Sequence, residues 1–341
     1  MSEEFTIVDV AKAAGVSVST VSRILNGKQD VAQATRARVQ HVIEELGYSP
    51  HAQAQGLRAG KTRNITLLFP LKRPGDIPFN PLDMDFIVGA AAAAGDREYF
   101  FSLLTSAVTK PSLINLYRSA QVDGVVLMQI YTHDWRVDLL RQRGYPFVMV
   151  GHCEDNRGLS YIDLDFEASV RVAFDHLVEL GHRSIGFLGQ SRELRDSGYG
   201  PVVRSWNGYQ QALQVHLVET ACREVGFDGN DVFVATLELL AEHPKLSAIV
   251  TTHAYPALSI LQALGARGLR VPEDCSVIAV TEGRIADLST PALTTIDFPS
   301  YDMGYRAVEM LSRILQDAMQ EPEQVLIPPR LITRKSTFPA K

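Results

Sequence analysis

The sequence predicts an α/β protein with a small helical head and a larger body built on two parallel sheets. From residue 64 onward, short apolar runs of β type alternate with helical patterns. Fully apolar strands separated by helices are typical of parallel sheets that are covered on both faces. Before residue 50, two short amphipathic patterns flank Gly15 and a third follows. The length of 341 residues allows two or three domains.

The head begins with two predicted helices around a tight turn. Thr6 can cap a first helix whose apolar residues repeat up to Ala14. Gly15 supplies the turn, because a positive φ costs glycine little. Ser17 can cap a second helix over Val18 to Leu25. This second helix keeps four side chains on its outer face: Val18, Ser19, Ser22 and Arg23.

A third helix begins near Thr35, buries Val39 and Val42, and stops at Gly47. It closes a three-helix core around the first two helices. This arrangement is a helix-turn-helix, in which the second helix enters the major groove of DNA. We therefore expect residues 1–48 to form a DNA-binding domain.

Composition and charge bound the function further. The net charge is -6, yet residues 1–61 carry a net +1 and the rest a net -7. A weakly positive head on an acidic body suits a reader of specific sites rather than a protein that coats nucleic acid. No apolar stretch approaches the roughly 18 residues of a membrane span, and no signal peptide is recognisable. We expect a cytoplasmic protein with no membrane partner.

The head resembles the lactose and galactose repressor family along its whole length. The resemblance is carried by TIVDVAKAAGVSVSTVSRILNG, by V-x-x-x-T-R at 31–36 and by LGYSPHAQAQGLRAGKT. It implies two sets of contacts with DNA. Base contacts are expected from Val18, Ser19, Arg23 and Leu57, and backbone contacts from Thr6, Ser17, Thr20, Ser22, Asn26 and Thr35.

The resemblance also implies a hinge helix and linker at 49–61, with Ala54, Gly56 and Arg58 as hinge residues. Leu57 stands where family members insert a leucine from each subunit into the minor groove at the centre of a palindromic site. We expect the hinge to be disordered away from DNA and helical on it. A simple flexible linker is the alternative.

The body, residues 62–341, is expected to have two lobes. Strands are predicted at 65–69, 100–104, 124–128, 147–150, 185–188, 248–251 and 277–280. The segments 165–189, 290–311 and 326–337 extend the resemblance over nearly the whole chain, and they imply a fold like that of periplasmic sugar-binding proteins. In such a fold, ligands collect between the lobes at the carboxyl ends of the strands.

The expected effector site departs from the family pattern. Arg204 lies four residues before Gly208 instead of three, and Thr281-Glu282 stands in place of a ligand-binding aspartate. A replacement set can nevertheless be assembled for a polar ligand: Phe79, His152, Asp163, Arg204, His253, Tyr255 and Glu282.

Enzymatic motifs are absent from the sequence. It has no G-x-S-x-G elbow, phosphate-binding loop or H-E-x-x-H motif. Cys153, Cys222 and Cys275 have no metal-type spacing and are expected to be buried thiols. His182 is expected to cap a helix. We therefore predict neither catalytic residues nor metal nor cofactor.

The sequence as a whole predicts a homodimeric repressor of carbohydrate-utilisation genes that binds a palindromic operator in double-stranded DNA. A small-molecule effector, a sugar, would release it. A dimer is favoured because no leucine heptads follow the final strand. Two alternatives remain open: a corepressor-type regulator with a non-sugar ligand, and a regulator that depends on a protein partner or on no ligand.

Overall fold

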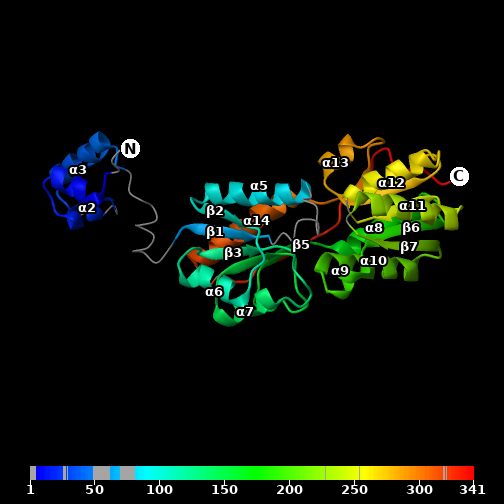
Figure 1. Ribbon diagram of the computed structural model, residues 1–341, viewed down its shortest axis with the longest axis horizontal. Coiled ribbons are helices and arrows are strands. Elements are labelled where there is room, and N and C mark those ends of the chain that lie inside the picture. Colours follow the sequence, from blue (N-terminus) through cyan, green and yellow to red (C-terminus); the bar gives the residue numbers. More distant parts are fainter. Residues whose placement is uncertain are drawn as a thin grey trace. The chain divides into compact units, whose positions relative to one another are not determined.

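The computed structural model describes residues 5–25, 28, 30–48, 62–69, 81–226, 228–252, 254–317, 319 and 321–341. The chain divides into two compact units, Met1–Thr62 and Arg63–Lys341 (Figure 1). Each unit has its own hydrophobic core. The predicted hinge lies outside the described residues, so it stays a prediction.

The head folds as the predicted three helices, α1 (Ile7–Ala13), α2 (Val18–Leu25) and α3 (Gln33–Leu46). Both predicted caps are confirmed. The amide of Asp9 donates to the Thr6 hydroxyl over 3.4 Å, and the amide of Thr20 donates to Ser17 Oγ over 3.1 Å. Gly15 has a φ of +62° and Gly47 a φ of +58°, as a turn and a helix end require.

The body contains two six-stranded sheets in separate halves of the unit (Figure 1). Lobe 1 has the order β11-β5-β4-β3-β1-β2, and lobe 2 has the order β12-β10-β9-β8-β6-β7. All pairs are parallel except β10 with β12. The strands of lobe 1 are β1 (Asn64–Leu68), β2 (Phe100–Leu104), β3 (Gly124–Leu127), β4 (Phe147–Val150), β5 (Tyr161–Leu164) and β11 (Gln324–Ile327). Those of lobe 2 are β6 (Ser184–Gln190), β7 (Glu219–Val225), β8 (Ala248–Thr251), β9 (Ser276–Thr281), β10 (Thr294–Asp297) and β12 (Leu331–Ile332).

Helices cover both faces of each sheet, which explains the continuous apolar strands. In lobe 1, α5 (Pro81–Asp96) and α14 (Ser300–Gln316) cover one face, and α6 (Lys110–Arg118) and α7 (Trp135–Arg143) cover the other. In lobe 2, α8 (Phe166–Glu179) and α10 (Gly200–Val215) lie opposite α11 (Gly229–Glu242) and α12 (Ala254–Ala266). Two shorter helices, α9 (Arg192–Asp196) and α13 (Gly283–Leu288), follow β6 and β9.

The chain crosses between the lobes three times. It leaves lobe 1 after β5, where Asp165 caps α8 by accepting from the amide of Ala168 over 2.8 Å. It returns between β10 and α14 and crosses again between β11 and β12. The segment 165–189 therefore begins at the first crossing, from lobe 1 into lobe 2. The two later crossings bring strands near the end of the chain into both sheets.

All seven predicted strands are present, and their ends differ from the predicted ones by at most two residues. Five strands were not predicted: β5, β7, β10, β11 and β12. All five stand at or next to a sheet edge. In β5, β7, β11 and β12, exposed or partly buried positions interrupt the buried run. The polar side chains Thr294, Thr295 and Asp297 conceal the strand pattern of β10. In that part of the chain that the structure describes, no helix could span a membrane.

Glycines allow the closest helix contacts in the body. A Cβ on Gly89 of α5 would lie 2.1 Å from the carbonyl oxygen of Tyr301, and one on Gly304 of α14 would lie 2.2 Å from that of Phe86. Only glycine therefore lets α5 and α14 approach this closely. Because α14 enters lobe 1 directly after a crossing, this contact fixes where the returning chain packs.

Replacement of Gly304 by alanine is expected to lower the free energy of unfolding by about 1–3 kcal/mol, since the new methyl group meets backbone that cannot move independently. Urea denaturation followed by circular dichroism measures the change. Gly95→Ala in α5 is the control, because its Cβ would meet nothing within 4 Å. A loss at Gly95 as large as the loss at Gly304 would contradict this account.

Candidate functional site

The outer face of α2 carries the residues expected to read DNA. Val21 and Ile24 are buried in the head core, which turns the intervening side chains outward. Ser19 and Arg23 are exposed, while Val18, Thr20 and Ser22 are partly buried. Thr6 and Ser17 lie at the amino ends of α1 and α2, where free backbone amides favour a phosphate.

Arg23 makes an ion pair with Asp30, in the connection from α2 to α3. Both side chains are about half exposed, at 58% and 48%. An ion pair this exposed contributes little to stability. The guanidinium is therefore held beside the recognition face at little energetic cost and remains available to another acceptor.

Three of the predicted effector residues meet where the lobes join. Asp163 is on β5, His152 follows β4, and Arg204 is on α10 of lobe 2. His152 Nδ1 lies 2.8 Å from Asp163 Oδ2, and Arg204 Nη1 lies 4.0 Å from the same oxygen. Arg204 Nη2 also donates to the carbonyl oxygen of His152 over 2.6 Å. Arg204 thus reaches lobe 1 despite its shifted sequence position.

This cluster is largely removed from solvent. The side chains of Asp163 and Arg204 are 4% and 13% exposed. Burial lowers the pKa of the Arg204 guanidinium, and the charge of Asp163 opposes that shift. Arg204 Nη1 is buried and has no hydrogen-bond partner. The arginine therefore joins the lobes and keeps one donor group available.

Backbone contacts accompany the arginine across the same junction. The amide of Gly200 donates to the carbonyl oxygen of Ile130 over 3.0 Å, and the amide of Thr132 donates to that of Gly198 over 2.8 Å. The rings of Tyr131 and Tyr199 lie 5.7 Å apart between these two hydrogen bonds. The loop after β3 is therefore fastened to the start of α10.

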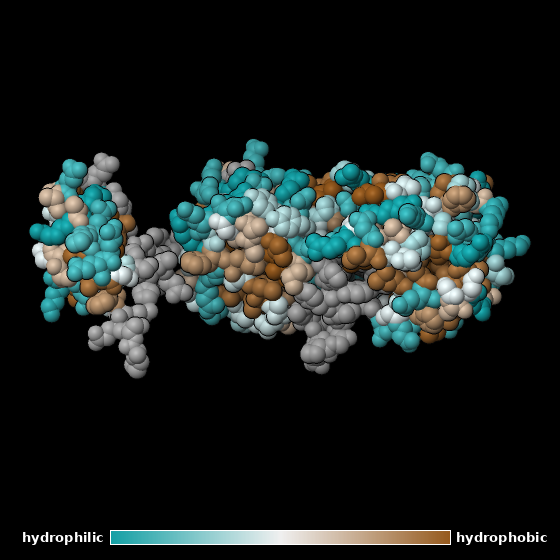
Figure 2. Space-filling model, turned by 90° about the horizontal axis from the view of Figure 1, so that it is seen from above, coloured by the Kyte–Doolittle hydropathy of each residue, from teal (hydrophilic) through white to brown (hydrophobic). Residues whose placement is uncertain are grey.

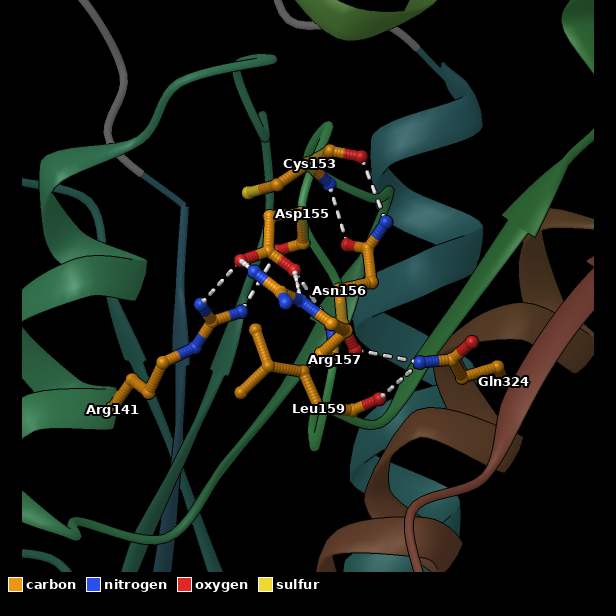
Figure 3. A network of polar contacts seen from close by, with 7 residues as sticks. All are labelled: Arg141, Cys153, Asp155, Asn156, Arg157, Leu159 and Gln324. Carbon is orange, nitrogen blue, oxygen red and sulfur yellow. Dashed lines mark hydrogen bonds and ion pairs between the residues drawn. The ribbon is translucent and has the colours of Figure 1, made fainter.

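The loop after His152 is held by a network of polar contacts (Figure 3). Asp155 accepts hydrogen bonds from both Arg141 and Arg157, so the pKa of its carboxyl is held well below its usual range. Gln324 of β11 donates to the carbonyl oxygens of Asn156 and Leu159. The loop that positions His152 is thus tied to α7 and to β11, the strand that precedes the last crossing.

Glu282 also lies at the junction, where it contacts Asp85 of lobe 1. It precedes α13 and is 8% exposed. Burial raises the pKa of its carboxyl, and a hydrogen bond and charge repulsion from Asp85 on α5 of lobe 1 raise it further. Arg284 lies 3.7 Å from Asp85, but its side chain is 73% exposed. Two carboxyl groups from different lobes therefore face each other here.

Several predicted site residues cannot be placed. Asn26, Ala54, Gly56, Leu57, Arg58, Phe79 and His253 lie outside the described residues, as does the side chain of Tyr255. Thr35 lies in the first turn of α3 and is partly buried.

Gln190, Thr251 and Thr281 end strands β6, β8 and β9 of lobe 2 and stand outside the predicted effector set. Each has a buried side-chain oxygen without a hydrogen-bond partner. In the sequence, each of these residues is a polar residue at the end of an otherwise apolar strand. That pattern could have singled them out, since ligands bind at the carboxyl ends of parallel strands.

His182 caps α8 through its backbone, since its amide donates to the carbonyl oxygen of Leu177 over 3.0 Å. Its side chain has a second role. Its ring nitrogens lie 2.9 Å from Ser247 Oγ, 3.1 Å from Ser276 Oγ and 3.0 Å from the carbonyl oxygen of Phe338. His182 therefore joins lobe 2 strands to the last residues of the chain. Burial lowers the pKa of the His182 ring, which favours its neutral form.

The three cysteines are free thiols, two of them buried and Cys222 partly so. Burial raises the pKa of Cys153 to about 11, which makes it unreactive near neutral pH. Among the described residues no group of three or more potential metal ligands was found.

Comparison with known proteins identifies both parts of the chain. Residues 6–51 match the model of the lacI family of bacterial regulatory proteins, and residues 174–337 match a periplasmic binding protein-like domain. The HTH-type transcriptional repressor PurR of Escherichia fergusonii is 30% identical over 334 residues, which are 97% of this chain and 96% of that protein. The chain belongs to the lacI family. It is accordingly a DNA-binding transcriptional regulator, and its relatives are regulators rather than enzymes.

Other lacI family members match over the same length. Catabolite control protein A of Priestia megaterium is 28% identical over 346 residues, covering 97% of this chain and 99% of that protein. A solved complex of the transcriptional regulator CelR with cellobiose has a TM-score of 0.71 at 27% identity, covering 97% and 99% of the two chains. The solved structure of a lac repressor dimer bound to operator matches this chain with a TM-score of 0.84 at 23% identity. This likeness concerns the fold only.

Arg204→Ala is expected to lower the free energy of unfolding by about 3 kcal/mol, because Asp163 loses a cationic neighbour while it stays buried. The change is measured by urea denaturation of the ligand-free protein. Arg192→Ala is the control, since Arg192 forms an exposed ion pair with Asp196 and should cost less than about 0.5 kcal/mol. Equal losses for the two variants would show that the buried Arg204–Asp163 pair stabilises the protein no more than an exposed ion pair does.

Glu282→Gln is expected to stabilise the protein at pH 8 and to have less effect as the pH approaches 4.5, the ordinary pKa of a glutamate. The folded state binds the Glu282 proton more tightly than the unfolded chain does. The wild type therefore loses stability as the pH rises through the raised pKa. Melting temperatures of both proteins between pH 4.5 and 8 measure this difference, and a constant difference would refute the assignment.

Proposed function

We propose that this protein is a homodimeric, cytoplasmic repressor of carbohydrate-utilisation genes, and that a sugar bound between its lobes releases it from a palindromic operator. The effector part of the proposal rests on one contact between the lobes, in which Arg204 of lobe 2 meets His152 and Asp163 of lobe 1. A ligand that contacts this cluster touches both lobes, so it can favour one arrangement of the lobes over another. Allostery requires only that difference in affinity.

The DNA-binding part of the proposal rests on residues of the head and the hinge. Ser19 and Arg23 stand on the exposed side of α2, where arginine can donate to guanine O6 and N7. Val18 would contact a thymine methyl group, and Leu57 would enter the minor groove. Thr6, Ser17, Thr20, Ser22, Asn26 and Thr35 would contact phosphates and set the register.

Exposed apolar side chains in lobe 1 support the homodimer. Apolar patches interrupt the hydrophilic surface of the body on the face seen in Figure 2. Met84 and Val88 of α5 are 45% and 48% exposed, and Phe100 of the edge strand β2 is 59% exposed. A helix and an adjacent sheet edge with large apolar side chains are suited to an interface between two copies.

Relatives support a carbohydrate effector. The CelR structure contains cellobiose, and a lacI family regulator from Enterococcus faecium contains ribose. Sugars are held by arginine, carboxylate and amide groups, and Arg204 and Asp163 supply the first two at the junction. No catalytic or cofactor chemistry forms part of this proposal.

Arg23→Ala is expected to reduce discrimination between operator and non-specific DNA about 10- to 100-fold, as the loss of one bidentate base contact does. Operator fragments are first selected from random duplex DNA by the wild type, and affinities are then measured by fluorescence anisotropy at fixed salt. Arg38→Ala is the control, because Arg38 is an exposed arginine of α3 with the same charge. Equal effects would mean that Arg23 contributes charge without reading bases.

The same assay tests release by effector. Cellobiose and ribose are added to the operator complex at up to tens of millimolar, and weaker binding supports induction. A ligand that tightens the complex would instead indicate a corepressor. No change with any sugar would refute the proposed effector.

A further inference from the structure

The connection between α2 and α3 places an acidic side chain against the recognition helix. Asp30 forms an ion pair with Arg23, which lies in the last turn of α2 and is expected to read a base edge. Both side chains are about half exposed. A carboxylate on a surface that approaches phosphates repels DNA, so its position beside Arg23 calls for an explanation.

Contacts on either side of Asp30 hold its place in the head. The amide of Lys28 donates to the carbonyl oxygen of Arg23 over 3.0 Å, and Arg36 Nη2 of α3 donates to the carbonyl oxygen of Lys28 over 2.5 Å. Beyond Asp30, Val31 packs against the core of the head. The carboxylate is therefore carried by a segment that is attached to both α2 and α3.

Neither stability nor helix capping explains the Arg23–Asp30 pair. An ion pair this exposed contributes little to the stability of the folded state. The next helix, α3, begins at its N-cap Ala32 without a side-chain hydrogen bond at the cap. Asp30 thus acts on Arg23 rather than on the helix that follows it.

The pair leaves Arg23 able to contact a base. It joins Arg23 Nη2 to Asp30 Oδ2. A guanidinium has five N–H donors in a planar fork, and a bidentate contact with guanine O6 and N7 needs only two of them. The arginine can therefore keep its carboxylate partner while it donates to guanine.

The pair also changes how Arg23 interacts with phosphates. A free surface guanidinium gains affinity for DNA of any sequence, because it neutralises a phosphate and releases a counterion. Beside Asp30 the two side chains together carry no net charge, so a phosphate gains little from Arg23. The guanine contact depends on the geometry of two hydrogen bonds as well as on charge. The carboxylate therefore weakens non-specific binding more than it weakens operator binding.

We propose that Asp30 is a specificity-determining residue, which restrains Arg23 at the recognition face and keeps it from binding phosphates. Arg23 then contributes to operator binding far more than to non-specific binding. The inference rests on the proposed function, because Asp30 can act in this way only if Arg23 reads a base. It adds a positioning residue that lies outside the predicted set of DNA contacts.

The test compares wild type with Asp30→Asn, which removes the charge and keeps the size of the side chain. Fluorescence anisotropy measures the affinity of the full-length protein for its selected operator and for a duplex of scrambled sequence, between roughly 50 and 300 mM salt. Asp30→Asn should tighten binding to the scrambled duplex about five- to tenfold and reduce discrimination by a similar factor. The slope of log affinity against log salt for that duplex should steepen by about 0.9, since Arg23 then neutralises one more phosphate.

Three further variants separate this effect from general charge. Glu45→Gln removes an exposed carboxylate of α3 and should change either affinity less than about twofold. In an Arg23→Ala background, Asp30→Asn should have no larger effect than Glu45→Gln, because the partner of Asp30 is gone. Asp30→Glu keeps the charge and should retain most of the discrimination.

The outcomes distinguish the role of Asp30 from operator recognition itself. Unchanged discrimination and salt slope in Asp30→Asn would overturn the inference, while a loss of discrimination in Arg23→Ala would keep Arg23 as a base reader. An effect of Asp30→Asn that is equally large with and without Arg23 would indicate general repulsion and would also overturn it. If the wild type enriches no common sequence from random DNA, the proposed operator recognition fails together with the inference.

Discussion

A buried charge cluster at the lobe junction joins the two lobes of the body. Arg204 belongs to lobe 2, while Asp163 and His152 belong to lobe 1, so the cluster exists only when the lobes meet. Its desolvated charges are stable only as a set, because removal of one leaves another buried without compensation. A ligand that competes for these groups therefore acts on the relative position of the lobes and not on one lobe alone.

The surrounding fold restricts how the lobes can change their relative position. Three crossings join the lobes, and the strand before the last one holds the His152 loop through Gln324. The returning helix α14 is packed against α5 by close glycine contacts at Gly89 and Gly304. These contacts join α14 to α5 and its sheet through closely packed backbone that deforms little.

The two sides of the junction differ in chemistry. One side holds the arginine, histidine and aspartate cluster, and the other holds neutral oxygens next to Glu282 and Asp85. An uncharged, hydroxyl-rich ligand can satisfy both sides, since hydroxyls both donate and accept. The polar groups on the two sides of the junction thus differ in charge.

The sequence by itself determined the head, the presence of two lobes and most strands, because local periodicity, caps and turn glycines such as Gly15 depend on near neighbours. It also identified His152, Asp163 and Arg204 individually. Only the tertiary structure decided that they meet, that Glu282 faces Asp85, and that Gln190, Thr251 and Thr281 share one face. Those facts depend on strand order and register between segments dozens of residues apart, which no local pattern encodes.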